Sequence, residues 1–396
     1  MCFLNHYSLR PRIAVGKCAS LYLGYLSIIV TVYFLFFTWR LRLKMFEHSP
    51  QSLLGIDISS SVVKILELGF KKNQYRVASY AVEPLIIGAV VDGKIEDKEA
   101  VSIAIRRAVK RSGSKTKYAA VAVPASLIIT KIISCPSSLT ESEMEEQVLF
   151  EAENFIPYPM DEVRLDFDVV GPSKQDENAV DVVLVASRRE NIDIRVDVLE
   201  MAGLKPKLID IEACTIERAY PLLSPQLSLL EDEKVVAIVE IGATITTLYI
   251  LVAGKIVFTR EQAFGGRMLT ENIGQHYGIP FQEAEQAKKE HILPEDYDAE
   301  VLEPFKSLMA MTITRALQFF FSTSTKYQSI DHIFLSGGCA SIPDVVAMIE
   351  ENTDAKTSIA NPFLDMTPGS KLSLLALNLD APSLLIACGL ALRNFD

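Results

Sequence analysis

The sequence predicts a duplicated α/β fold with a nucleotide-binding core, because one short pattern occurs twice, about half a chain apart. Residues 56–68 read IDISSSVVKILEL, and residues 239–251 read VEIGATITTLYIL. Each begins with an acid between two apolar residues, at Asp57 and Glu240, and continues through three small or hydroxyl residues into an apolar strand. An acid at a strand end can hold a metal, and a tight turn of small residues brings backbone N–H groups to a phosphate. Two such units facing each other would clamp a polyphosphate from both sides.

The first half begins with alternating apolar and polar residues that are typical of a three-stranded antiparallel meander. We expect its strands at 53–58, 62–69 and 75–83. A helix is expected over 98–111, with its apolar residues on one face, and a buried strand over 119–123.

The second half repeats the meander and then becomes largely helical. The expected elements are, in chain order, strands at 235–241, 245–252 and 256–261, helical regions at about 267–291 and 298–328, a strand at 332–338 and a final helix at 383–395.

A segment with a different pattern of expected helices and strands lies between the halves, at about 124–206. Thr140 and Glu143 form a capping box that opens a helix, strands are expected on both sides of it, and a further helix is expected over 189–202. We interpret the segment as a compact α+β module inserted within a larger domain. The domain boundaries are then 1–44 for an N-terminal extension, 45–123 for the first part of the core, 124–206 for the inserted module and 207–396 for the rest of the core.

The N-terminal extension contains a candidate membrane-spanning helix. Residues 18–39 carry no charge over 22 positions, which is long enough to cross a bilayer. Three basic residues precede this segment and three follow it, so the positive-inside rule does not orient it. A removed signal peptide is disfavoured, because no small-residue cleavage site is present. The alternative to an anchor is translation from Met45, just before the expected soluble domain.

Composition and charge argue against several classes of function. The six cysteines and five histidines are scattered without C-x-x-C spacing, which disfavours a disulfide framework or a zinc site and fits reduced thiols in a cytosolic compartment. After residue 44 the chain carries 33 basic and 50 acidic residues. Because nucleic-acid binding requires cations that neutralise phosphates, it is not expected here.

The first candidate site is the segment Gly55–Lys64, G-I-D-I-S-S-S-V-V-K. Asp57 would bind Mg²⁺ directly or through water, Ser59 and Ser60 would offer N–H and hydroxyl groups to phosphate, and Lys64 would reach phosphate oxygens from the next strand. An ordinary hairpin with an exposed lysine is the alternative, and the partner motif in the second half disfavours it.

Glycines in the second half add candidate phosphate ligands. Gly242 permits a close approach of the backbone to phosphate, although a hairpin with an incidental glycine is the alternative. Gly265 and Gly266 open a helix whose N-terminal N–H groups would help to bind an anion.

Two further pairs are candidates for contacts with a base and a sugar. Gly337 and Gly338 follow an apolar strand and would let a flat ring lie against the backbone, unless they form a plain strand-to-helix turn. Glu285 and Lys288 lie one helical turn apart, a spacing that is also common for solvent-exposed ion pairs.

Taken in this order, the segments resemble the actin-like ATPase superfamily, which includes FtsA, sugar kinases and heat-shock chaperones, and more closely the PilM family of type IV pilus assembly. The resemblance covers about residues 50–396 and implies an α/β, actin-like (ribonuclease H-like) duplicated fold with an inserted FtsA-type α+β subdomain. The segments that carry it are LLGIDISSSVVKILEL, QVLFEAENFIPYPMDEV (147–163), FTREQAFGG (258–266) and ACGLALR (387–393).

The resemblance implies four groups of nucleotide-binding residues. They are Asp57, Ser59, Ser60 and Lys64 for phosphate and Mg²⁺; Gly242, Ala243 and Thr244 for the phosphates from the other side; Glu285 and Lys288 for ribose and adenine; and Gly337 and Gly338 for the base.

The resemblance implies fewer residues for metal binding and catalysis than for nucleotide binding. Asp57 and Glu240 are the candidate metal ligands, and Glu212 and Glu240 are the candidate catalytic residues, Glu212 by orienting the attacking water. Serine stands at Ser59 where glycine is usual, and Glu240 stands where aspartate is usual. The longer carboxylate moves its oxygens by about one C–C bond, so we expect ATP and Mg²⁺ to bind with slow or no turnover.

The family also implies partners. Its members dock the short cytoplasmic N-terminal tail of the membrane protein PilN in a groove between the first subdomain and the inserted one. We therefore expect a cytoplasmic ATP-binding adaptor associated with the inner membrane, with PilN and other pilus platform and motor proteins as partners; self-association stays open. One alternative is an FtsA-like division filament, disfavoured because the sequence ends without a basic amphipathic helix. Another is a small-molecule kinase, disfavoured because the inserted module offers no obvious catalytic aspartate.

Overall fold

The computed structural model describes residues 52–395 apart from 174–175, 228–233 and 325. The predicted extension 1–44, with its candidate membrane-spanning segment 18–39, lies outside the described residues. Within the described part, the stretch Leu374–Leu392 has the length and apolar character of a membrane span, but most of it is buried inside the protein. Its position identifies it as part of the core.

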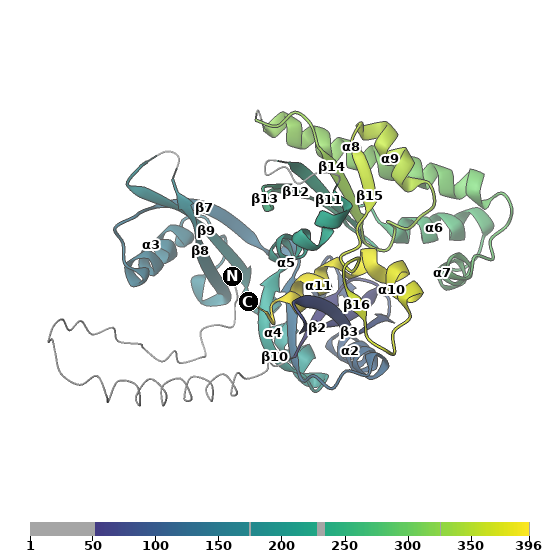
Figure 1. The fold of residues 1–396 in the computed structure, drawn as a ribbon, viewed down its shortest axis with the longest axis horizontal. Helices are drawn as coiled ribbons and strands as arrows, with labels where there is room; N and C mark the ends of the chain where they lie inside the picture. The colour runs from purple at the N-terminus through teal and green to yellow at the C-terminus, as the bar shows by residue number, and fades with distance from the viewer. Residues whose placement is uncertain (1–51, 174–175, 228–233, 325, 396) are drawn as a thin grey trace, which may run out of the picture.

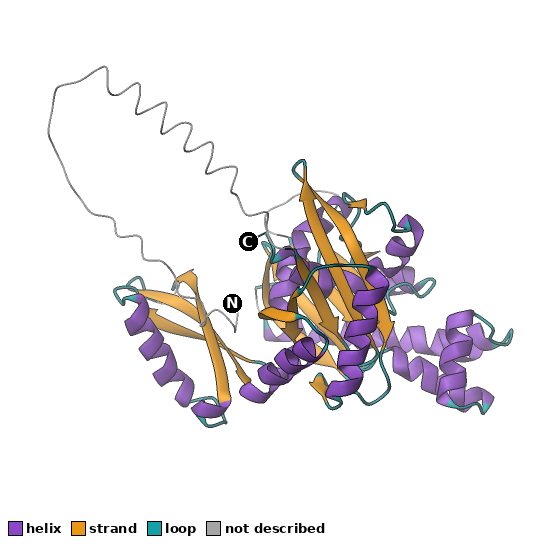
Figure 2. Cartoon of the chain, turned by 90° about the horizontal axis from the view of Figure 1, so that it is seen from below, coloured by secondary structure: helices purple, strands orange, loops and turns teal. Residues whose placement is uncertain are grey.

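Two β-sheets that share a five-strand arrangement form the centre of the molecule, and the first sheet has β16 as an additional edge strand (Figures 1 and 2). The first runs β10-β6-β1-β2-β3-β16 and the second β13-β12-β11-β14-β15. Each sheet contains a three-stranded antiparallel meander followed in space by two parallel strands. The duplication predicted from the two short patterns is therefore confirmed.

The strands of the two sheets have the following bounds. In the first sheet they are β1 (Leu53–Ile58), β2 (Val62–Lys71), β3 (Gln74–Pro84), β6 (Tyr118–Val123), β10 (Lys205–Ile211) and β16 (Thr367–Pro368), and in the second β11 (Val235–Ile241), β12 (Thr246–Val252), β13 (Lys255–Gln262), β14 (His332–Ser336) and β15 (Lys356–Ile359).

Helix α2 (Lys98–Ser112) covers the first sheet at the position that the sequence predicts. It begins where the Asp97 side chain accepts a hydrogen bond from the Ala100 N–H, and it ends at Gly113, whose φ of 70° is left-handed. These two caps satisfy backbone groups that have no partner within the helix. A short ribbon of β4 (Val90–Val91) and β5 (Lys94–Ile95) precedes it.

The inserted α+β module is a three-stranded antiparallel sheet of order β7-β9-β8 with one helix, and it projects from the body of the molecule (Figure 1). The capping box predicted at Thr140 is present, and its helix buries Met144, Val148 and Ala152 against the sheet. The elements are β7 (Ile129–Pro136), α3 (Glu141–Glu153), β8 (Val163–Pro172) and β9 (Ala179–Arg188).

Helix α4 (Arg189–Met201) packs differently from the sequence interpretation, which placed it in the module 124–206. It contacts α2, β6 and β10, and Ile192, Val198 and Leu199 belong to the core of the first half. The buried Arg195 side chain binds three backbone carbonyls, including that of Ala122 at the end of β6. The sheet of the inserted module ends at β9, and α4 is an element of the core.

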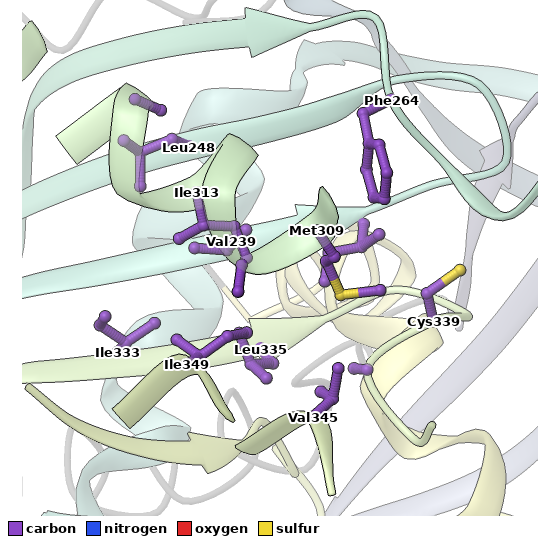
Figure 3. Packing of buried hydrophobic residues seen from close by; sticks show 14 of the residues in the cluster. Val239, Leu248, Phe264, Met309, Ile313, Ile333, Leu335, Cys339, Val345 and Ile349 are labelled. Carbon is purple, nitrogen blue, oxygen red and sulfur yellow. The ribbon is translucent and has the colours of Figure 1, made fainter. Parts of the chain in front are cut away.

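The second half has a core in which helices cover one face of its sheet (Figure 3). Strand residues such as Val239, Leu248 and Leu335 pack against Met309 and Ile313 of the long helix α8. The helices are α6 (Gly266–Tyr277), α7 (Phe281–Glu290), α8 (Glu303–Thr323), which a π-helical turn at Asp298–Leu302 precedes, and α9 (Val345–Thr353).

Helices α5 (Glu212–Ala219) and α11 (Leu385–Leu392) join the two halves. Their apolar residues share one cluster with Leu53 of the first sheet and Phe334 of the second. Close contact depends on glycine: a Cβ at Gly55 would lie 2.2 Å from the Ala387 carbonyl oxygen, and one at Gly389 would lie 2.0 Å from that of Thr215. The connecting helices are the 3-10 turn Tyr220–Gln226, α10 (Leu374–Asp380) and the 3-10 turn Ala381–Leu384.

Candidate functional site

The tips of the two repeated hairpins meet between the halves of the molecule. The Ser60 and Thr244 hydroxyls, 184 residues apart in the chain, lie 3.3 Å from each other. Each hairpin is closed by its own backbone bond, from Ser59 N–H to Val62 O and from Gly242 N–H to Ile245 O. The fold therefore brings the two predicted phosphate motifs together, as a two-sided clamp requires.

Asp57 and Lys64 form a buried ion pair at the base of the first hairpin. They face each other in the register of β1 and β2, and Lys64 Nζ lies 2.8 Å from Asp57 Oδ2. Burial lowers the pKa of Lys64, but the charges of Asp57 and Glu240 outweigh it and raise this pKa above its ordinary value. In this arrangement the predicted metal ligand and the predicted phosphate ligand bind each other.

Two further carboxyl groups lie in the electrostatic field of this pair. Burial raises the pKa of Glu240 to about 7, and the charge of Asp57 adds to the shift. Burial also raises the pKa of Glu212, with further contributions from Glu240 and Asp57. The fold thus gathers the two predicted catalytic acids near Asp57, with Lys64 as a cation among them.

Gly265 and Gly266 pack directly on the second hairpin. A Cβ at Gly265 would lie 2.5 Å from the Ala243 carbonyl oxygen. The Gly266 N–H donates to the Gly242 carbonyl at 3.0 Å, and the Arg267 N–H donates to that of Ala243 at 2.8 Å. The first amides of α6, which the sequence predicts to bind an anion, are therefore bonded to the hairpin, and the glycines make that contact sterically feasible.

Glu285 and Lys288 contact each other on α7 rather than extending separately into solvent. The Thr270 hydroxyl, fully buried on α6, donates to Glu285 Oε2 at 2.6 Å, and Lys288 Nζ donates to the same oxygen at 2.6 Å. Lys289 Nζ lies 3.0 Å from Glu285 Oε1. Burial would raise the pKa of Glu285, but the bonds from Lys288 and Thr270 lower it overall.

Gly337 and Gly338 differ in what surrounds them. A Cβ at Gly337, where φ is 89°, would lie 2.3 Å from the Ile241 carbonyl oxygen, so this residue holds β14 close to β11. Gly338 is exposed, and a Cβ there would meet no atom within 4 Å. Only the second glycine therefore has open space beside it for a flat ring.

Cys339 connects the glycine pair to the α6–α7 region. A Cβ at Gly266 would lie 2.7 Å from Cys339 Sγ. Burial raises the pKa of the Cys339 thiol to about 11, while the charges of Lys288 and Glu285 act on it from nearby. The predicted phosphate, ribose and base residues of the second half consequently lie in one region.

Sequence reasoning missed Thr270, Lys289 and Cys339 as parts of this region. The signal for Thr270 was its position one helical turn after Gly266, which puts a hydroxyl on the same face of α6. Lys289 directly follows the predicted Lys288, and its spacing of four from Glu285 is an ion-pair spacing as well.

The donor groups fit a nucleotide better than they fit a metal held by protein alone. No group of three His, Cys, Asp or Glu side chains in the described part of the chain is arranged to hold a metal ion. Mg²⁺ keeps several waters and is commonly bound through one or two carboxylates together with substrate phosphates. Asp57 and Glu240 are two carboxylates of the kind that this pattern requires, one on each of the two adjoining hairpins.

A family model described as type IV pilus assembly protein PilM matches residues 55–395. The chain belongs to the PilM family. The match includes both predicted phosphate motifs, the inserted module and the final helix, so it covers nearly every described element.

Solved structures have the same fold. A PilM–PilN type IV pilus biogenesis complex matches with a TM-score of 0.73 and 25% identity, over 87% of this chain and 98% of that chain. Ethanolamine utilization protein EutJ from Carboxydothermus hydrogenoformans matches with a TM-score of 0.50 and 17% identity, over 86% and 88% of the two chains. The predicted actin-like fold is confirmed.

A curated relative outside the pilus proteins matches a smaller part of the chain. Ethanolamine utilization protein EutJ of Salmonella typhimurium is 26% identical over 179 residues, which is 44% of this chain and 55% of the relative. The chain thus spans about half the length of the curated relatives it matches. The PilM-family assignment rests on the match over residues 55–395.

Proposed function

We propose that this PilM-family protein is an ATP-binding adaptor of the type IV pilus inner-membrane assembly complex that docks the cytoplasmic tail of a PilN protein. The docking site would lie between the inserted module and the first half of the core. The observation that carries this proposal is the uncovered face of the inserted sheet. Family membership and the similarity to a PilM–PilN complex support it.

The uncovered face of the inserted sheet combines apolar and acidic residues. Helix α3 packs on the residues of the opposite face. On the uncovered face, the strand register places Ile132, Val183 and Asp168 in one row across β7, β9 and β8. The next row, toward the core, contains the half-buried Asp166 beside the buried Val185. Ile132 is 62% exposed. Such a face would suit an extended peptide with apolar side chains and basic groups.

The first half has an exposed apolar residue close to the segment where the inserted module joins the core. Val91 on β4 is exposed. The turn that follows it contacts the segment leading into β7, since a Cβ at Gly93 would meet the Pro124 ring at 2.5 Å and the Ser126 hydroxyl at 3.2 Å. A peptide between the module and the core would therefore have apolar surface on both sides.

ATP with Mg²⁺ would bind between the two hairpins. Asp57, Ser59, Ser60 and Lys64 would hold phosphate and metal from one side, and Gly242, Ala243 and Thr244 from the other. Glu285 and Lys288 would face the ribose, and Gly338 the base. When bound, Mg-ATP would offer phosphate oxygens to Lys64 and its metal to Asp57, so each residue of the ion pair would have a new partner. Glu240 in place of the shorter aspartate would position water or metal poorly, which supports retention of ATP with slow turnover.

One hydrogen bond connects the half that carries the second hairpin with the inserted module, and so connects the proposed nucleotide site with the proposed docking face. Glu261 at the end of β13 accepts a 3.0 Å hydrogen bond from the Ser126 N–H at the root of the inserted module. The chain after Glu261 leads to Gly265, which packs on the second hairpin. A change in the separation of the two halves on ATP binding would therefore shift the module and bias the docking face.

The docking proposal is tested by calorimetric titration of the full-length protein with a synthetic peptide of the cytoplasmic N-terminal tail of PilN from the same organism. We expect Ile132→Asp to weaken binding by about tenfold or more, because one apolar anchor in a peptide site is worth roughly 1.4 kcal/mol or more. Leu375→Asp, at a 72% exposed position on α10, is the control. Failure of the folded wild type to bind, or equal affinity of Ile132→Asp, would contradict the proposal.

A further inference from the structure

Helix α7 presents two different faces. Glu285, Lys288 and Lys289 recur at spacings of three and four and form the ion-pair cluster described above. At about 100° per residue, Glu283, Gln286, Ala287 and Glu290 lie on the opposite side of the helix. These residues therefore point away from the predicted nucleotide site.

A cavity of about 390 Å³ lies against this second face of α7. This volume falls within the roughly 300–1,000 Å³ that is usual for ligand pockets. The segment that follows α7 and the end of α6 complete its wall, which is mostly apolar. Tyr277, Glu283, Gln286 and Ile292 are among the lining residues.

Acidic groups surround the apolar wall. Glu283 lines the cavity itself. Asp296 accepts a hydrogen bond from the hydroxyl of the lining residue Tyr277 at 2.9 Å, and Glu290 accepts one from the amide of the lining residue Gln286 at 3.0 Å. Residues 271–303 contain nine Asp or Glu and two Lys. The electrostatic potential at this cavity is therefore negative.

An apolar side chain at the mouth of the cavity is exposed to water. Ile292 is 65% exposed in the stretch immediately after α7. An exposed branched apolar side chain beside an apolar hollow, surrounded by charges of one sign, is a typical composition of an interaction site. The negative rim selects among occupants, since an anionic membrane surface or an acidic peptide would be repelled.

We infer that this cavity is a docking site for a protein segment that carries apolar anchor residues flanked by Lys or Arg. The site is separate from the face proposed for the PilN tail, because it lies on α6 and α7 of the second half and not on the inserted module. An occupant would contact the same ten-residue helix that carries Glu285 and Lys288.

The probe for this inference is a fluorescein-labelled peptide with two leucines between pairs of arginines, titrated against the full-length protein by fluorescence anisotropy. Two control peptides keep the length: one replaces the leucines by serines, and the other replaces the arginines by glutamates. We expect the leucine–arginine peptide to bind at least tenfold more tightly than either control, and its affinity to fall as salt is added.

Protein variants locate the binding site. Ile292→Asp and Glu283→Lys should each weaken binding of the leucine–arginine peptide about tenfold, and both positions are exposed, so folding should be retained. Leu375→Asp and Glu351→Lys make the same changes at exposed positions outside the cavity and should bind like the wild type. Equal binding by the cavity variants, no preference over the control peptides, or no binding at about 1 mM peptide would overturn the inference.

Discussion

Asp57 and Lys64 form an ion pair in the folded protein at two positions where the sequence predicts nucleotide ligands. The sequence indicates two separate ligands for a nucleotide, whereas the register of the hairpin makes them a buried ion pair. A buried ion pair contributes little net stability compared with apolar residues of similar size, but removal of one partner leaves an uncompensated charge. The pair is therefore well suited to exchange partners when a charged ligand enters.

Removal of one partner of this pair should be more harmful than removal of both. We expect Lys64→Met to lower the free energy of unfolding by roughly 3–5 kcal/mol, because Asp57 then stays buried without a counter-charge. The double variant Asp57→Val/Lys64→Met should recover much of that loss. Urea denaturation of the three proteins without nucleotide measures both effects, and a double variant as unstable as Lys64→Met would contradict the explanation.

His332 should make stability depend on pH. It is 7% exposed at the start of β14, its Nε2 lies 2.8 Å from the Ser358 hydroxyl, and burial lowers its pKa below the ordinary value. Between that lowered pKa and about 6.5, the unfolded chain binds a proton that the folded chain does not. The contribution of His332 to stability is therefore present above pH 6.5 and is lost as the pH falls.

His332→Gln tests this sign directly. The variant should lose less of its unfolding free energy than the wild type when the pH is lowered from about 7.5 to 5. Denaturation curves at each pH give the comparison, and parallel pH dependences in the two proteins would show that His332 is not responsible.

At the scale of elements, the helix of the inserted module should depend on its N-cap. Thr140→Ala removes the side-chain bond to the Glu143 N–H and should cost about 1 kcal/mol of local stability. Hydrogen exchange of the α3 amides should then be about fivefold faster. Ser142→Ala, at an exposed position inside the same helix, is the control and should not accelerate exchange.

Elements with a local signal could be predicted, and those defined by distant contacts could not. The helix α2, the capping box of α3 and the strands of both meanders follow from periodicity and caps within a few residues. By contrast, α4 has an ordinary helical pattern, and only its contacts with α2 and β10 show that it belongs to the core. Strand β16 has two residues and exists because it pairs with β3, nearly 300 positions earlier.

The residues of the candidate site also divide into those with a local signal in the sequence and those defined by distant contacts. The glycines and acids of the repeated motifs were identifiable because a turn with a close backbone approach favours particular residue types. The Ser60–Thr244 contact and the hydrogen bond from Thr270 to Glu285 could not be predicted, because each joins segments that meet only in the folded chain. The engagement of the first α6 amides by the second hairpin was equally invisible in the sequence.

At the scale of the whole molecule, two similar halves meet at α5 and α11, and the site lies between them. Gly55 and Gly389 let α11 approach both β1 and α5 closely. Asp210 on β10 pairs at 2.6 Å with Arg393 just after α11, which fixes the end of the chain to the first half. A ligand that contacts both hairpins would therefore act on the relative position of the halves and, through Ser126, on the inserted module.

The measurement that tests the central claim most directly is calorimetric titration of the full-length protein with Mg-ATP, comparing the wild type with Gly338→Val. A Cβ added at Gly338 would meet no atom within 4 Å, so the melting temperature should change little, but the valine side chain would occupy the space proposed for the base. We predict that the wild type binds and that Gly338→Val binds at least about tenfold more weakly. Absence of binding by the folded wild type, or equal affinity of the variant, would contradict the account.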